Sequence, residues 1–170
     1  AQLKWTHGVY LTKRPTELGF VRQRLASDRR FWVMCMVRDP RDIIVSRHDK
    51  EPDKFWAPLH FWKTEIADLR RVASHPRFLT IRYEDLVMQP DAVQDRIQAR
   101  LPFLRKTAKF SEFHNFAEPS AKSVKALRGV RPISTSSIGN WKNHLPRVAG
   151  QIALHGAITD ELIEFGYEPD

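Results

Sequence analysis

The sequence predicts an α/β fold in which a parallel sheet is flanked by helices. Residues 31–37 are a continuous apolar run of strand length, and residues 77–82 alternate like a second strand. Between them, apolar side chains recur every three or four positions from Phe55 to Ala73, which is the spacing of one helical stripe. Strands that alternate with helices are typical of α/β proteins. We expect the two strands to be neighbours or to be separated by one missing strand.

Length and composition fit one globular domain, residues 1–170. The chain has 42% hydrophobic and 28% charged residues, which excludes disorder throughout. No apolar run approaches the ~18 residues of a membrane span. With a single cysteine, Cys35, no internal disulfide can form. The chain begins at Ala1 without a methionine, so we expect the domain to be incomplete at its N-terminus.

The positive charge is unevenly distributed. The net charge is +8, and residues 119–159 contain no acid but six lysines and arginines. Five acids then follow within residues 160–170. An acid-free stretch on an otherwise mixed chain favours an anionic partner, although a solvated basic face would give the same pattern.

The first strand and the helix after it have the clearest signals. Residues 31–37 are apolar on both faces, which favours a strand buried within the sheet. Asp39 suits the N-cap of the next helix, Pro40 its first position and Asp42 its first turn. We expect this helix to run from Pro40 to about Arg47. A strand that ends at a helix N-terminus is an arrangement by which α/β folds hold phosphate.

The remaining elements follow from periodicity and from breaking residues. A helix is predicted over residues 55–73 and closed by Pro76, with its aromatic side chains in the core. Gly156 and Gly166 are expected to end the last two helices. The other elements expected are helices at residues 16–26, 90–101, 146–155 and after a Thr159 cap, and a loop at residues 128–142.

Three features could bind a ligand. Arg38 ends the first strand and Ser46 lies two turns into the predicted helix, so a guanidinium and a hydroxyl could close on one oxyanion. Tyr83 ends the second strand, at the sheet edge where α/β ligands lie, and could pack on a base. The third feature is the loop at residues 131–141, where four hydroxyl residues lie between an arginine and a glycine.

The first two features also have a purely structural interpretation. Arg38 could pair with Asp39 or Asp42, and Glu84 and Asp85 could cap the turn after the second strand. Other chemistries have little support, because the sequence lacks the motifs HExxH, GxSxG and GxGxxG and a Walker A glycine loop. We therefore expect no metal site.

Together and in this order, the three features resemble the sulfotransferases that use 3′-phosphoadenosine 5′-phosphosulfate (PAPS). Residues 37–46 (VRDPRDIIVS) are similar to the 3′-phosphate-binding motif of that family. Residues 82–87 (RYEDLV), followed by Pro90, resemble its YEDL segment. Residues 139–143 (GNWKN) resemble the segment that closes the cofactor loop. The resemblance covers most of the chain.

The resemblance implies a bacterial-type sulfotransferase domain with a fold related to the P-loop kinases. It implies that Arg38 and Ser46 hold the 3′-phosphate of the donor and that Tyr83 lies near the adenine. In the third segment, Arg131 or backbone amides are expected to replace the charge of an Arg-Lys-Gly triplet found in cytosolic animal members. The residues expected to bind the donor are Arg38, Ser46, Tyr83, Arg131, Ser134, Thr135, Ser136 and Gly139.

Two departures limit what the resemblance implies. The loop that holds the 5′-phosphosulfate, PKSGTT or PRSGT, is absent and is expected upstream of Ala1. Without that loop the chain alone could bind nucleotide poorly and turn over nothing. The usual catalytic histidine of a KTH segment is also missing, because residues 11–15 read LTKRP there, so no catalytic residue is assigned.

The reaction implied is transfer of the sulfuryl group of PAPS, without a metal, to a hydroxyl or amine of a small-molecule, carbohydrate or protein acceptor. This interpretation expects no nucleic-acid partner. One alternative is a noncatalytic module that binds nucleic acid or another polyanion, which the positive charge favours. Another is a nucleoside or sugar kinase, which would prefer ATP. A cytoplasmic location is expected, with a lumenal domain of a Golgi enzyme as the alternative.

Overall fold

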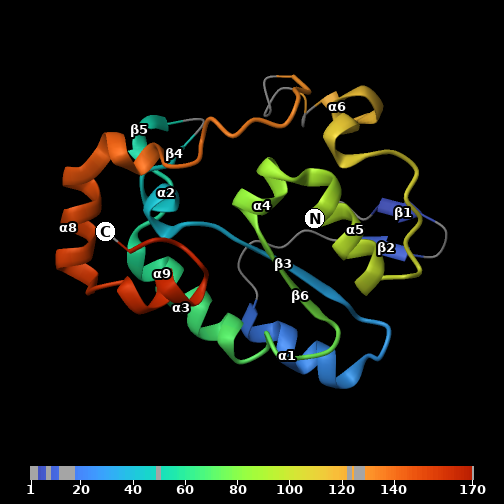
Figure 1. The fold of residues 1–170 in the computed structure, drawn as a ribbon. Helices are drawn as coiled ribbons and strands as arrows, with labels where there is room; N and C mark the ends of the chain where they lie inside the picture. Colours follow the sequence, from blue (N-terminus) through green and yellow to red (C-terminus); the bar gives the residue numbers. More distant parts are fainter. Residues whose placement is uncertain are drawn as a thin grey trace.

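The computed structural model describes residues 4–6, 9–11, 18–48, 51–121, 124 and 129–169. The described chain is a mixed α/β fold in which a two-stranded parallel sheet is flanked by helices (Figure 1). The strands of this sheet are β3 (Val33–Val37) and β6 (Phe78–Arg82). Two short antiparallel hairpins accompany it, and they are formed by β1 (Lys4–Thr6) with β2 (Val9–Leu11) and by β4 (Arg47–His48) with β5 (Glu51–Phe55).

The parallel pairing of β3 and β6 confirms that the two predicted strands are neighbours. Val33 lies opposite Phe78, and Val37 lies opposite Arg82. Both strands therefore end at the same edge of the sheet. The residues that follow them, Arg38 and Tyr83, are brought to that edge together.

One face of β3 is less buried than its apolar sequence predicts. Val33, Cys35 and Val37 pack into the main core, whereas Met34 is 41% and Met36 52% exposed. Leu79 and Ile81 of β6 lie opposite Met34 and Met36, on the same face of the sheet, and pack into a smaller core with α5 (Pro90–Arg100). Because α5 covers the β6 side of that face, the two methionines of β3 stay exposed. The expectation that β3 is buried on both faces is wrong.

The helix after β3, α2 (Pro40–Ile44), begins where the sequence predicts but is shorter than expected. Asp39 caps it by accepting a hydrogen bond from the Arg41 amide at 2.8 Å. It ends at Ile44, so Ser46 lies beyond the helix and not two turns into it, and Arg47 already belongs to β4. Val45 caps the helix, and the Trp56 amide donates to the Ser46 carbonyl at 2.8 Å, so Ser46 leads into the β4–β5 hairpin.

Helix α3 (Leu59–Arg70) carries most of the stripe predicted for residues 55–73. Leu59, Trp62, Ile66 and Leu69 are buried in the main core, as predicted. The helix starts later than expected, with Phe55 in β5, because Pro58 holds the residue before it out of the helical conformation.

The helices predicted at residues 16–26, 90–101, 146–155 and after Thr159 lie close to their predicted positions. They are α1 (Leu18–Ser27), α5, α8 (Leu145–His155) and α9 (Thr159–Glu164). Four further helical segments of the described chain were not predicted: α4 (Tyr83–Met88), α6 (Phe113–Phe116) and the 3₁₀ helices η1 (Phe110–Glu112) and η2 (Asn140–His144), the last of which begins within the predicted loop of residues 128–142. Gly156 and Gly166 follow the last two α-helices with φ of 86° and 71°, as expected for helix ends. Thr159 is the first residue of α9 and not its cap, which is Ile158. Within the described ranges, every helix is too short or too polar to span a bilayer.

Candidate functional site

The sheet edge at the ends of β3 and β6 holds a cluster of three side chains. The Arg38 guanidinium lies over the Tyr83 ring, with its carbon 4.5 Å from the ring centre. Arg38 Nη2 donates to the Ser137 carbonyl at 2.6 Å, and the Tyr83 and Ser137 hydroxyls are hydrogen-bonded at 2.7 Å. In Figure 1 the orange segment that leads into η2 crosses above α4, on the side where these strands end. The three candidate segments of the sequence therefore meet at one place.

Asp42 attaches the third segment to α2. Its carboxylate is buried and accepts hydrogen bonds from the amides of Gly139 (2.8 Å) and Trp141 (2.9 Å). Gly139 has a φ of 72°, a left-handed conformation that glycine adopts without a Cβ clash. Arg38 Nη2 is 3.9 Å from the same carboxylate. Asp42 thus fixes the backbone that the sequence predicts to close over a ligand.

Glu84, at the start of α4, connects this edge to the C-terminal region. Its buried carboxylate accepts a hydrogen bond from the Asp39 amide at 3.0 Å and from the Tyr167 hydroxyl at 3.0 Å. Burial and the neighbouring Glu84 carboxylate raise the pKa of Tyr167 well above its ordinary value. Glu84 therefore joins two distant segments, which is more than the local cap that the sequence suggests for it.

The Asp39 carboxylate also has partners within the fold. It caps α2 and forms a buried ion pair with Arg41, whose Nη2 is 2.9 Å from the carboxylate. The Arg41 guanidinium in turn lies 4.2 Å from the centre of the Trp141 ring. Arg41, and not Arg38, therefore pairs with Asp39, whereas Arg38 forms an ion pair with Asp42, so the structural interpretation of Arg38 holds for Asp42 and is wrong for Asp39.

Arg38 retains unused hydrogen-bonding capacity. Its Nε is buried and has no hydrogen-bond partner within the described chain, while the side chain as a whole is 23% exposed. A buried N–H group without a partner is unfavourable unless something else accepts its hydrogen bond. The Arg38 side chain is thus mostly enclosed and charged, and its exposed part is where an additional acceptor could reach it.

Among the described residues, no hydrogen bond, ion pair or ring contact joins Ser46, Ser134, Thr135 or Ser136 to the side chains of the Arg38 cluster. Ser46 is half-buried between α2 and β4. Ser134 and Ser136 are exposed and hydrogen-bonded to each other, with 2.9 Å between their hydroxyl oxygens. Thr135 and Arg131 are exposed as well. The roles that the resemblance gives these residues therefore remain predictions.

Ser137 is the contact residue that the sequence analysis missed. It is the last of four consecutive hydroxyl residues, and it meets Arg38 through its backbone carbonyl. Any residue type offers that carbonyl, so only the Ser137 hydroxyl, which is bonded to Tyr83, has a signal in the sequence, as one of the four hydroxyl residues.

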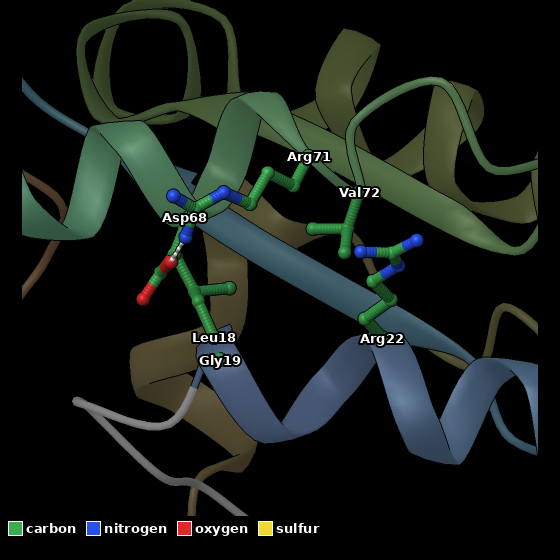
Figure 2. Close-up of a pocket in the computed structure, with 6 residues that line it drawn as sticks. All are labelled: Leu18, Gly19, Arg22, Asp68, Arg71 and Val72. Carbon is green, nitrogen blue, oxygen red and sulfur yellow. Dashed lines mark hydrogen bonds and ion pairs between the residues drawn. The ribbon is translucent and has the colours of Figure 1, made fainter.

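Two cavities of the described chain are lined by residues outside this cluster. A cavity of about 210 Å³ between α1 and α3 contains the ion pair of Asp68 and Arg71 and is shown in Figure 2. A second, of about 300 Å³, is lined by Phe110, Phe113 and Phe116 beside basic side chains. Neither is lined by a residue predicted to bind the donor.

Within the described part of the chain, no three His, Cys, Asp or Glu side chains are grouped so that they could hold a metal ion. Comparison of the chain with models of protein families, with curated proteins and with solved structures finds no match. The function is therefore inferred from the arrangement of the chain's own residues.

Proposed function

We propose that this chain is a sulfotransferase domain that binds PAPS and passes its sulfuryl group to a hydroxyl or amine acceptor. The observation that carries the proposal is the contact of Arg38 with both Tyr83 and Ser137. Arg38 and Ser137 are 99 positions apart, and Tyr83 and Ser137 are 54 apart. These residues belong to, or directly adjoin, the three segments that resemble the PAPS sulfotransferases. Their convergence supports one binding site built from all three.

The chemistry of the cluster fits a phosphorylated nucleoside. An anionic oxygen that reaches the exposed part of the Arg38 side chain would accept a charge-assisted hydrogen bond from its guanidinium. Tyr83 contributes an aromatic ring beside that charge, which suits stacking against a base. PAPS carries both groups: a phosphate on the 3′ oxygen of its ribose and the aromatic base adenine. The finer fold assignment, a P-loop-kinase-like sulfotransferase, belongs to the same proposal.

In the proposed reaction the acceptor oxygen or nitrogen attacks the sulfur in line. The bond between sulfur and the 5′-phosphate oxygen breaks, and adenosine 3′,5′-bisphosphate leaves. The acceptor proton passes to a base that is not assigned. Arg38 and Ser46 would bind the 3′-phosphate, remote from the sulfur, so that their binding energy orients the reacting end.

The test is isothermal titration of the chain with adenosine 3′,5′-bisphosphate. Binding is the readout because the sequence contains no PKSGTT or PRSGT segment to hold the 5′-phosphosulfate. We expect saturable one-site binding, which Ser46→Ala weakens by about 1–2 kcal/mol and Arg38→Ala weakens by more because a charged partner is lost. Arg30→Ala is the matched control, since it removes one arginine whose side chain is 96% exposed. It should leave the affinity unchanged.

The same titration separates the alternatives. A polyanion-binding module would bind oligonucleotides with a steep dependence on salt, and Arg30→Ala would weaken that binding as much as Arg38→Ala does. A kinase would bind ATP more tightly than the bisphosphate. Either result, or the absence of saturable bisphosphate binding, contradicts the proposed function.

A further inference from the structure

Two arginines from different elements meet on one aromatic ring at the C-terminal end of α2. Arg47 belongs to β4 and Arg147 to α8, and both guanidinium groups lie against Phe55 of β5. Their central carbons are 3.9 and 4.4 Å from the ring centre. Figure 1 shows β4, β5 and the first turn of α8 together at one end of the molecule.

No carboxylate of the described chain neutralises this pair. Arg47 Nη1 donates to the Asp53 carbonyl at 3.1 Å, and Arg147 Nε donates to the Ile44 carbonyl at 3.4 Å. Neither arginine takes part in any ion pair formed among the described residues. The His144 ring, with its centre 6.5 Å from that of Phe55, adds a third basic group. Burial, together with the charge of Arg47, lowers the pKa of Arg147.

The two guanidinium groups lie within reach of each other around one ring. Because both lie against the same ring, their carbons cannot be farther apart than the two ring distances combined, about 8 Å. One oxyanion can bridge such a gap with charge-assisted hydrogen bonds of about 2.8 Å to each guanidinium. It would also reduce the repulsion between two like charges that have no carboxylate partner among the described residues.

We propose that Arg47 and Arg147 form a second oxyanion site, which binds a carboxylate or sulfate group carried by the acceptor. The anion site stands on the geometry alone, and only its assignment to the acceptor rests on the proposed function. Arg38 precedes α2, whereas Arg147 donates to the carbonyl of the last α2 residue, Ile44. The five residues of α2 separate the two places by about 7 Å at 1.5 Å per residue. An acidic acceptor and the nucleotide could therefore bind together.

The test measures oxyanion binding in chains that carry Arg38→Ala, so that the proposed nucleotide site does not contribute. Sodium sulfate and sodium acetate are titrated in separate arms at constant ionic strength, and the unfolding temperature is followed. We expect the unfolding temperature to rise saturably with sulfate or with acetate, depending on which of the two anions the site binds. Adding Arg47→Gln or Arg147→Gln should weaken the apparent affinity at least tenfold, whereas adding Arg30→Gln should leave it unchanged. Arg47 is exposed, so Arg47→Gln should fold even if Arg147→Gln does not.

The outcomes separate this site from the nucleotide site. If Arg47→Gln binds both anions as tightly as Arg30→Gln does, the second site is overturned. Ser46 is the neighbour of Arg47, so bisphosphate is also titrated into Arg47→Gln in the otherwise unchanged chain. A loss of bisphosphate affinity as large as that of Arg38→Ala would assign Arg47 to the nucleotide and overturn a separate site. If bisphosphate does not bind the unchanged chain while sulfate or acetate binding depends on Arg47, the proposed function fails and the oxyanion site stands.

Discussion

The two ends of α2 differ in how their charges are balanced. At the N-terminal end, the buried carboxylates of Asp39, Asp42 and Glu84 accept hydrogen bonds from backbone amides, from Arg41 and from Tyr167. At the C-terminal end, Arg47 and Arg147 meet without a carboxylate partner in the described chain. The first end is a framework whose polar groups satisfy one another. At the second end, two positive charges have no carboxylate partner among the described residues.

Because of this difference, we expect substitutions at the first end to change mainly stability and substitutions at the second end to change mainly anion binding. Removing a framework carboxylate leaves buried amides without acceptors, so the main loss is in the free energy of unfolding. Removing one of two repelling cations changes stability little and alters the response to anions and salt. Arg38 lies between these cases, since it contacts the framework and still has a donor without a partner in the described residues.

The largest effect is expected for Asp42→Ala. It leaves the buried Trp141 amide and the half-buried Gly139 amide without their acceptor, so we expect the free energy of unfolding to fall by about 3 kcal/mol in urea titrations. Asp95→Ala removes an exposed carboxylate paired with Lys106 and should change it by less than about 1 kcal/mol. Similar losses in the two variants would contradict the framework role of Asp42.

A smaller effect is expected at high pH from Tyr167. Its folded-state pKa is raised by burial and by Glu84, so above about pH 10 the unfolded chain loses the proton while the folded chain keeps it. The free energy of unfolding should therefore fall with pH by up to about 1.4 kcal/mol per pH unit. Tyr167→Phe should flatten this slope, at a loss of about 1 kcal/mol at pH 7 from the missing hydrogen bond to Glu84.

Both proteins in that comparison carry Cys35→Ser. Burial raises the pKa of Cys35 to about 11, so its thiol would otherwise titrate in the same range. Urea titrations from pH 8 to pH 11 give the slopes. Identical slopes with and without the Tyr167 hydroxyl would contradict the assignment.

The smallest effect is expected at the cationic end. Arg47→Gln should change the free energy of unfolding by less than about 1 kcal/mol, because loss of a cation–π contact is offset by relief of repulsion from Arg147. Added sodium chloride should stabilise the unchanged chain more than this variant, since salt screens the repulsion that the variant lacks. An equal response to salt in both would show that the two charges do not repel.

Local signals in the sequence predict the framework well. The apolar runs predict β3 and β6, and the Asp39-Pro40 pair predicts where α2 begins, because each depends on a residue and its immediate neighbours. The end of α2 is predicted less well, since it depends on the pairing of β4 with β5. Neither this hairpin nor the β1–β2 hairpin was predicted.

The site is predictable in its segments but not in its contacts. Arg38, Tyr83 and Gly139 stand out by residue type and by their place after strands or in a turn. Apart from the bond between the Tyr83 and Ser137 hydroxyls, the hydrogen bonds that join them involve the Ser137 carbonyl and backbone amides, which every residue type offers. The Arg47–Phe55–Arg147 contact joins residues that have no shared motif, so only the folded chain brings it to notice.

The most direct test of a nucleotide site at Arg38 compares two ligands that differ by one phosphate. Adenosine 3′,5′-bisphosphate and adenosine 5′-monophosphate are titrated into the unchanged chain and into Arg38→Ala. If Arg38 holds the 3′-phosphate, the bisphosphate should bind the unchanged chain at least tenfold more tightly, and Arg38→Ala should abolish that difference. A charge-assisted contact of about 1.5–3 kcal/mol is sufficient for such a change. Equal affinity of the unchanged chain for the two ligands, or equal weakening of both by Arg38→Ala, would contradict the account.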